Sequence, residues 1–216
     1  MILAYQSEFI ELCVRQGVLR FGSFTLKSGR ESPYFFNAGL LSTGASIEAV
    51  GRAYAAAITA SNLEFDMLFG PAYKGIPLVT ITAAALATQG GRDLPFAFNR
   101  KESKDHGEGG HIVGGPLRGS VLIVDDVITA GTAVRESIDI IKAAGARPAG
   151  VLLALDRQEL GPRSRLSAVQ EVREQFGVPV VAVVNLADLM HHLSGHGRPE
   201  DLARMQAYRE RHGLAD

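Results

Sequence analysis

The sequence is poor in cysteine and carries almost no net charge. The single cysteine, Cys13, excludes an intramolecular disulfide and a thiolate metal site. Its place in an amphipathic helical pattern predicts a small core residue. The 22 basic residues nearly balance the 23 acidic ones, giving a net charge of −1, so a general binder of nucleic acid or of membrane surfaces is not expected.

Long apolar runs are also missing. No stretch approaches the length of a membrane span, and the first residues include acids but none of the basic residues that open a signal peptide. No internal repeat or low-complexity linker is present. We therefore expect a cytoplasmic protein with no nucleic-acid or membrane partner. A length of 216 residues with 46% apolar content suits one α/β domain with a small appendage.

Strand and helix patterns alternate along the chain, which predicts a mostly parallel sheet covered by helices on both faces. A hairpin separate from this sheet is expected within residues 18–39. The expected strands of the sheet lie near residues 65–69, 96–98, 121–124, 151–155 and 178–184. The expected helices lie near residues 4–16, 45–60, 75–87, 133–141, 166–176, 186–193 and 199–212.

The stretch VLIVDDVITAGTAVRES, residues 121–137, carries the clearest chemistry. Its apolar run predicts a strand buried on both faces, and the run stops at Asp125 and Asp126. A loop of small and hydroxyl residues follows, and then a helix. Such a loop and the first turn of such a helix offer backbone N–H groups to a phosphate, while the carboxylates can accept hydrogen bonds from sugar hydroxyls. A phosphorylated sugar fits this order, beyond the carboxyl end of a strand.

Two further stretches favour an anionic ligand. FGPAYKGIP, residues 69–77, repeats the order of strand, small-residue loop and helix and adds Lys74. NRKESKDHGEGGHIVGG, residues 99–115, is polar and glycine-rich, with no apolar periodicity. We expect it to be a long loop, either solvated or acting as a lid that closes over a polyphosphate. His106 and His111 could suggest a metal, but their spacing with the acids fits no common ligand pattern.

Each of these features also has a purely structural interpretation. An aspartate before a helix is usually a cap, and Gly-Thr is usually a turn. Lys27 and Lys74 could be solvated lysines, and the aromatic cluster at residues 34–36 could be ordinary core packing. The occurrence of all parts together and in order favours function.

The segments FTLKSGRESPYFFNAG, FGPAYKGIP, FNRKESKDHGEGG, VDDVITAGTA and LDRQE, in this order, resemble the bacterial orotate phosphoribosyltransferases, which belong to the type I phosphoribosyltransferase family. The resemblance covers nearly the whole chain and is weakest over residues 158–165 and after about residue 190. It implies a central, mostly parallel, five-stranded sheet flanked by helices. It also implies one domain with an N-terminal hood at about 1–40, a core at about 41–190 and a helical tail at about 191–216.

The resemblance implies synthesis of orotidine monophosphate from orotate and phosphoribosyl pyrophosphate with Mg²⁺, in pyrimidine biosynthesis. It also implies a homodimer whose lid reaches the partner's active site. The residues matched to phosphoribosyl pyrophosphate are Lys27, Tyr73, Lys74, Arg100, Lys101, Lys104, His106, Asp125, Asp126, Val127, Ile128, Thr129, Ala130, Gly131, Thr132 and Ala133. Those matched to orotate are Phe35, Phe36, Thr129 and Arg157.

Among these, the catalytic residues implied are Lys27, Lys104, His106, Asp125 and Asp126. A strained peptide bond is expected just before Tyr73, and no side chain is expected to ligate the metal directly. Arg157 suits orotate because a guanidinium can pair bidentately with a carboxylate. Two alternatives remain: a non-catalytic regulator that senses phosphoribosyl pyrophosphate, and a transferase for a purine or uracil. The lid, Arg157 and the lack of a basic extension argue against the regulator. Arg157 and the stretch of residues 34–36 argue against a purine or uracil, because a neutral base needs no partner for a carboxylate.

Overall fold

The computed structural model describes residues 2–26, 29–104, 110–128, 131–161 and 165–214. Its strands are β1 (Leu19–Thr25), β2 (Glu31–Phe36), β3 (Met67–Gly70), β4 (Phe96–Lys104), β5 (Gly110–Gly114), β6 (Ser120–Asp125), β7 (Arg147–Asp156) and β8 (Val180–Asn185). Its helices are α1 (Ala4–Arg15), a 3₁₀ turn η1 (Ala38–Leu40), α2 (Gly44–Ser61), α3 (Gly75–Gly90), α4 (Thr132–Ala143), α5 (Ala168–Phe176), α6 (Leu186–Gly195) and α7 (Pro199–His212). None of the helices in the described ranges is long and apolar enough to cross a membrane.

The central sheet has the strand order β5-β4-β3-β6-β7-β8 within the described residues. The pairs from β4 to β8 are parallel, as expected for strands joined by helical crossovers, and these are the five strands predicted from the sequence. The strand number was nevertheless wrong by one, because β5 adds an antiparallel edge strand. Residues 99–115 were expected as a loop, but their described parts include the end of an extended β4 and the whole of β5, which pair antiparallel.

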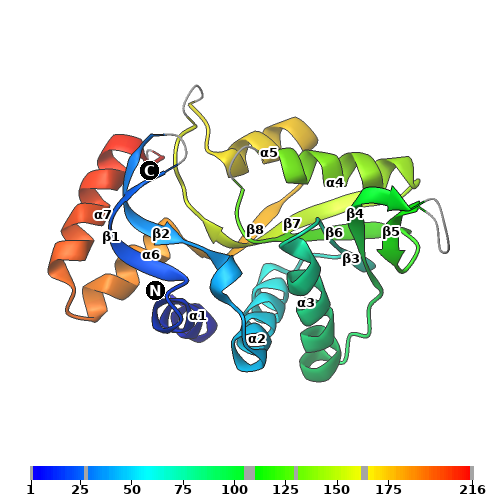
Figure 1. The fold of residues 1–216 in the computed structure, drawn as a ribbon, viewed down its shortest axis with the longest axis horizontal. Helices are drawn as coiled ribbons and strands as arrows, with labels where there is room; N and C mark the ends of the chain where they lie inside the picture. Colours follow the sequence, from blue (N-terminus) through cyan, green and yellow to red (C-terminus); the bar gives the residue numbers. More distant parts are fainter. Residues whose placement is uncertain (1, 27–28, 105–109, 129–130, 162–164, 215–216) are drawn as a thin grey trace.

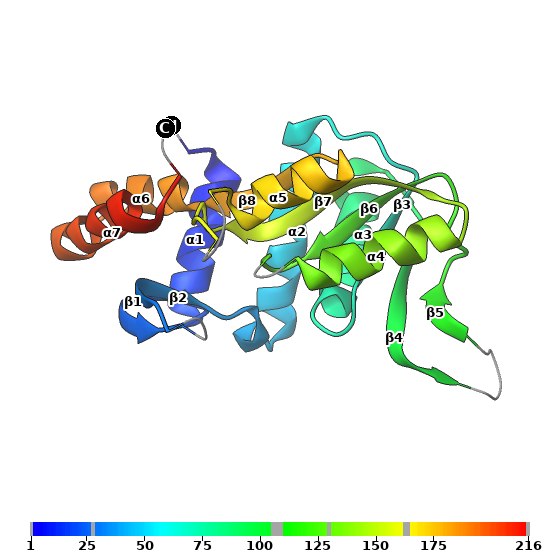
Figure 2. The same ribbon diagram turned by 90° about the horizontal axis from the view of Figure 1, so that it is seen from above.

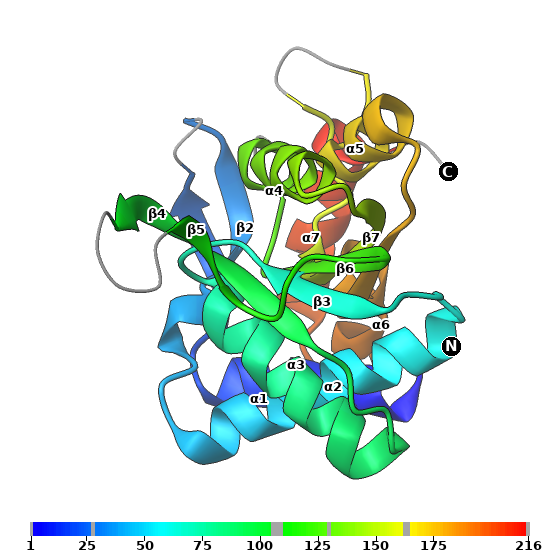
Figure 3. The ribbon, with the colours of Figure 1, turned by 90° about the vertical axis from the view of Figure 1, so that its right-hand side faces the viewer.

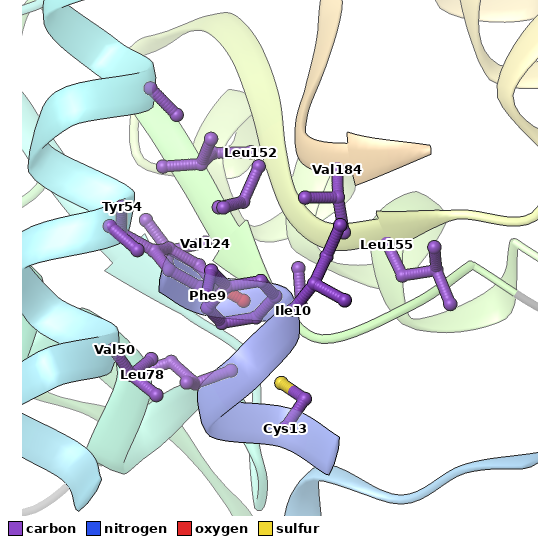
Figure 4. Close-up of a cluster of buried hydrophobic side chains, with 14 of the residues drawn as sticks. Phe9, Ile10, Cys13, Val50, Tyr54, Leu78, Val124, Leu152, Leu155 and Val184 are labelled. Carbon is purple, nitrogen blue, oxygen red and sulfur yellow. The ribbon is translucent and has the colours of Figure 1, made fainter. Parts of the chain in front are cut away.

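The sheet separates two hydrophobic cores. Alternate strand residues face opposite sides, so Leu122 and Val124 join one core while Val121 and Ile123 join the other. Helices α1, α2 and α3 cover the first face and α4 and α5 cover the second (Figures 1 and 3). Figure 4 shows the first core, where side chains of α1, including the buried Cys13, point toward α2 and the central strands. The prediction that Cys13 is a core residue is confirmed.

Two appendages lie at opposite ends of the sheet. The β1–β2 hairpin, predicted from the sequence as a separate element, gathers with α6 and α7 at one end, and the β4–β5 hairpin projects at the other (Figure 2). The hairpin is joined to the tail by an edge-to-face contact between Tyr34 of β2 and Tyr208 of α7, with ring centroids 6.4 Å apart. The carboxyl ends of the neighbouring strands β3, β6 and β7 lie between these appendages, where parallel sheets bind ligands.

Candidate active site

Two adjacent carboxylates end the buried strand β6. Asp125 is its last residue and Asp126 follows, and they are 7% and 5% exposed. Backbone N–H groups hold both side chains: that of Asp126 donates to Asp125 Oδ1 at 2.9 Å, and that of Val127 donates to Asp126 Oδ1 at 2.8 Å. Burial raises the pKa of Asp125 to about 7, and the adjacent charge of Asp126 adds to this shift. The pair is therefore preorganised to accept hydrogen bonds from hydroxyl groups.

Lys74 lies next to this acid pair. Its Nζ is 2.6 Å from Asp126 Oδ2, although the side chain remains 53% exposed. Lys74 is the residue directly before α3. The end of β3 and the start of α3 lie very close together, and glycines at both positions make this approach possible. A Cβ on Gly70 would lie 2.3 Å from the carbonyl oxygen of Gly75. The strand end and the helix start therefore place a cation against the acid pair.

The loop before Lys74 contains a cis peptide between Ala72 and Tyr73. An unusual peptide was expected at this position. The backbone N–H of Ala72 donates to Asn99 Oδ1 of β4 at 2.8 Å, which ties the loop to the neighbouring strand. Sequence reasoning did not identify Asn99, because an asparagine within a polar segment gives no signal of its own. Tyr73 is 68% exposed, so its ring and the backbone beside it are open to a ligand.

The small-residue loop after the acid pair ends in a helix with unused donors. Gly131 is the residue before α4 and has φ +69°, a conformation that favours glycine. Among the described residues no side chain caps α4, and its first turn contains no acid, so the first N–H groups can serve an anion. Val127 and Ala133 are half-buried and Ile128 is buried. Thr132 is exposed, while Thr129 and Ala130 lie outside the described residues.

The residues assigned to a lid lie on the β4–β5 hairpin. Arg100 is half-buried and Lys101 is exposed, with its Nζ 5.9 Å from the centroid of the Tyr73 ring. Lys104 ends β4, opposite Gly110 of β5. The structure thus places the base of the hairpin beside the Tyr73 loop. His106 and Lys27 lie outside the described residues.

Arg157 follows β7 and lies against the β1–β2 hairpin. Its Nη2 is 2.7 Å from Glu159 Oε1, and its guanidinium is 4.5 Å from the centroid of the Tyr34 ring. Tyr34 Oη also donates to Glu159 at 3.1 Å. Glu159 therefore holds Arg157 and Tyr34 together. The sequence did not reveal this contact, although Glu159 belongs to the LDRQE segment.

The hairpin strand that meets Arg157 also carries the two predicted orotate residues. Phe35 and Phe36 follow Tyr34 in β2 and are half-buried. The ring of Phe35 lies 5.7 Å from that of Phe24. Arg157 therefore contacts the carboxylate of Glu159 and the ring of Tyr34, and the strand that carries Tyr34 continues into Phe35 and Phe36. Such a frame suits a flat, anionic ring.

These groups meet at one edge of the sheet. Strands β3, β6 and β7 are consecutive neighbours, and they lead into Lys74, the acid pair and Arg157. The backbone N–H of Ala154 in β7 donates to the carbonyl of Asp126 at 2.9 Å, so the ends of β6 and β7 are joined directly. At this edge the two carboxylates lie between Lys74 and Arg157, and the first N–H groups of α4 follow them. Each of these positively polarised groups can bind an anion.

Comparisons with known proteins agree with this arrangement. Residues 39–182 match the family described as "Phosphoribosyl transferase domain". The chain is 62% identical over 214 residues to an orotate phosphoribosyltransferase of Marinobacter nauticus, covering 97% of this chain and 99% of the relative. It is 59% identical over 211 residues to that of Methylococcus capsulatus, covering 98% and 99%. The crystal structure of orotate phosphoribosyltransferase from Francisella tularensis superposes with a TM-score of 0.87 at 43% identity, covering 95% of this chain and 99% of that one.

Proposed function

The chain belongs to the orotate phosphoribosyltransferases, and from this membership we propose how its residues perform the reaction. The enzyme transfers the ribose 5-phosphate group of phosphoribosyl pyrophosphate to N1 of orotate and releases pyrophosphate. In our proposal the sugar phosphate lies over the end of β6, pyrophosphate lies toward Lys74, and orotate lies toward Arg157.

The acid pair and the loop after it hold the ribose 5-phosphate. Asp125 and Asp126 accept hydrogen bonds from the ribose hydroxyls, and residues 127–133 enclose the 5′-phosphate. The backbone contacts that orient both carboxylates and the uncapped start of α4 support this assignment. A carboxylate repels phosphate, so the phosphate belongs on the α4 side and the hydroxyls on the acid side.

Cations surround the pyrophosphate. Lys74, with the Tyr73 loop, faces it from the core, while Arg100, Lys101, Lys104 and His106 approach from the lid. The position of Lys101 near Tyr73 supports the meeting of lid and loop. Negative charge grows on pyrophosphate as the bond to C1 breaks, so these cations stabilise the transition state more than the ground state.

Orotate binds between Arg157 and the hairpin. Arg157 pairs with the orotate carboxylate, while Phe35, Phe36 and Thr129 surround the ring. Glu159 and Tyr34 support this role because they hold the guanidinium in one place before orotate arrives. Lys27 approaches the reacting centre from the hairpin turn.

Mg²⁺ fits this site as a partner of the substrate. Mg²⁺ usually keeps several of its waters while it binds substrate phosphates, and two adjacent carboxylates can accept hydrogen bonds from such waters. Asp125 and Asp126 would hold it mainly through the ribose hydroxyls and water, without direct ligation. When bound, Mg²⁺ supplies positive charge that neutralises pyrophosphate.

The chemical step moves C1 of ribose from a pyrophosphate oxygen to N1 of orotate through a transition state with oxocarbenium character. The C1–O bond breaks as the N1–C1 bond forms, and the electron pair of the broken bond leaves with pyrophosphate. N1 of orotate gives up its proton, which passes to water or to the released pyrophosphate. Orotate is a weak anionic nucleophile, so its positioning by Arg157 matters as much as the charge around pyrophosphate. Closure of the lid excludes water, which would otherwise hydrolyse the sugar. His106 is the candidate to protonate pyrophosphate.

We also propose that the protein works as a cytoplasmic homodimer, with each lid reaching the partner's site. The residues divide into a hood (1–40), a core (41–190) and a helical tail (191–216) that act as one unit. The hood carries Phe35, Phe36 and Lys27, while the core carries Arg157, Thr129 and the other residues proposed for phosphoribosyl pyrophosphate, so neither part suffices alone.

The observation that carries this proposal is the contact between Lys74 and Asp126, next to Asp125. It places a cation for the pyrophosphate beside the two carboxylates for the ribose hydroxyls. The direct test is the ultraviolet absorbance of orotate mixed with protein, phosphoribosyl pyrophosphate and Mg²⁺. We expect loss of the orotate band only when all components are present. Consumption of a purine or uracil instead would indicate another base specificity. Binding of phosphoribosyl pyrophosphate without any turnover would indicate a regulator.

A further inference from the structure

Three potential metal ligands gather on elements that carry none of the residues proposed for the transfer. His192 lies on α6 and His196 is the residue directly after its end, four positions further along the chain, while Glu11 lies on α1. One ligand atom from each residue lies within 4.8 Å of the others. Within the described ranges this is the one cluster of three or more such groups.

The backbone already orients one of the imidazoles. Nδ1 of His196 is 2.7 Å from the carbonyl oxygen of His192, and a carbonyl can only accept, so this nitrogen carries the proton. Nε2 then has the lone pair, and it lies 4.0 Å from Glu11 Oε1. Metal-binding histidines commonly donate their second nitrogen to a backbone carbonyl in this way, which fixes the tautomer and the direction of the free lone pair.

The second imidazole packs against the first. The rings of His192 and His196 are stacked, with centroids 3.8 Å apart. His192 is buried, and its Nδ1 has no hydrogen-bond partner among the described residues. Two stacked imidazoles next to a carboxylate therefore bring three potential donors together on one side of α6.

We propose that Glu11, His192 and His196 form a binding site for a divalent cation of the zinc class. Two imidazoles and one carboxylate are a common donor set for Zn²⁺, with a fourth position left to water. Mg²⁺ prefers oxygen donors and is a poor competitor here. Ligand atoms around zinc are about 3.4 Å apart at bond lengths near 2.1 Å, so the cluster must contract slightly. Glu11 and His196 can move, since their side chains are 53% and 49% exposed.

A bound ion would join the first helix of the chain to α6. These helices contact each other on the same face of the sheet, where both contribute to the first core. A ligand that binds only the folded state stabilises it by mass action, and here the three donors converge only after folding. The site is therefore structural, and its occupancy should change stability without acting through the proposed active site.

The test is a titration of the metal-free full chain with ZnCl₂, in the presence of Mg²⁺, followed by calorimetry and by the unfolding temperature. We expect the wild-type protein to bind one Zn²⁺ at this site and to unfold at a higher temperature with it. The variant His196→Gln should bind at least about tenfold more weakly. His191→Gln is the matched control, because this exposed histidine lies on the same helix outside the cluster, and it should bind like the wild type.

Other histidines could also bind zinc, and the comparison between variants separates them from this cluster. Equal affinity of His196→Gln and the wild type would overturn the proposal, as would the absence of Zn²⁺ binding. Circular dichroism of each variant without metal shows whether it is folded. If His196→Gln were unfolded, Glu11→Gln, at an exposed position, would replace it with the same expected loss.

Discussion

Asp125 ends a strand that is buried along its whole length, so the fold makes its ionisation unfavourable. Burial raises the pKa of Asp125 to about 7, while an aspartate in an unfolded chain titrates near pH 4. At a pH between these two values the folded protein holds a proton that the unfolded protein has lost. Stability of the substrate-free protein is therefore expected to fall as pH rises through this window.

The variant Asp125→Asn should remove this pH dependence. The asparagine Oδ1 can still accept the N–H of Asp126, and no charge has to be buried. We expect it to be more stable than the wild type by about 1 to 3 kcal/mol at about pH 8 and nearly equal at about pH 4, measured by urea unfolding. Its transferase activity should be strongly reduced, because its amide would replace the proposed acceptor of a ribose hydroxyl. A difference in stability that does not change with pH would contradict the assignment.

Arg157 is expected to select for the carboxylate of orotate. In Arg157→Lys the planar fork is lost while the charge is kept, so we expect KM for orotate to rise about tenfold or more and KM for phosphoribosyl pyrophosphate to change little. Arg30→Lys is the matched control, since Arg30 also lies near Glu159, at 3.6 Å, but has no proposed contact with orotate. An equal rise in both KM values would indicate a general loss of structure.

For single residues, the sequence predicted which residue types belong to the site and in what order, but not which residues contact each other. Asp125, Asp126 and Lys74 could be predicted together because each follows an apolar run that reads as a buried strand. Asn99 and Glu159 could not, because their importance comes from one hydrogen bond to Ala72 and one ion pair with Arg157. Those contacts depend on how separate segments approach each other in the folded chain.

Among the elements, the junction of β3 and α3 depends on the absence of side chains. A Cβ at Gly70 would meet the backbone of Gly75 and could not be accommodated by a change of rotamer. We expect Gly70→Ala to lower the free energy of unfolding by about 2 kcal/mol or more. Gly90→Ala, at the far end of the same helix where a Cβ has open space, is the control and should be neutral or slightly stabilising. Equal effects of the two substitutions would show that the junction can relax.

The elements were predictable wherever apolar periodicity was strong. The α4 stripe of Val134, Ile138 and Ile141 is buried as expected. The β5 strand was missed because its apolar signal is only Ile112 and Val113, set among glycines and charged residues. Its pairing with β4 is set by the antiparallel ladder opposite Phe98 and Asn99. A short edge strand of this kind depends on its partner more than on its own composition.

For the whole molecule, the proposed exchange of lids predicts rescue between inactive subunits. Lys104→Ala removes a lid cation and Asp126→Asn removes a core carboxylate, so each should lose most activity alone. If each lid serves the partner, half of a random mixture is heterodimer, with one intact site in two. Mixing equal amounts after dissociation should then restore about a quarter of wild-type activity. No restoration, despite heterodimers detected by mass spectrometry, would place the lid on its own site.

Strand β6 is packed on both sides, with successive residues assigned to different cores. Removal or insertion of a single residue would exchange the two sets and rotate the carboxylates at its end to the wrong side of the sheet. Exchange of one aliphatic residue for another leaves that order intact. Over evolutionary time, therefore, residues 120–126 should accept substitutions of similar size, while gene variants that lengthen or shorten this segment by one codon should be lost.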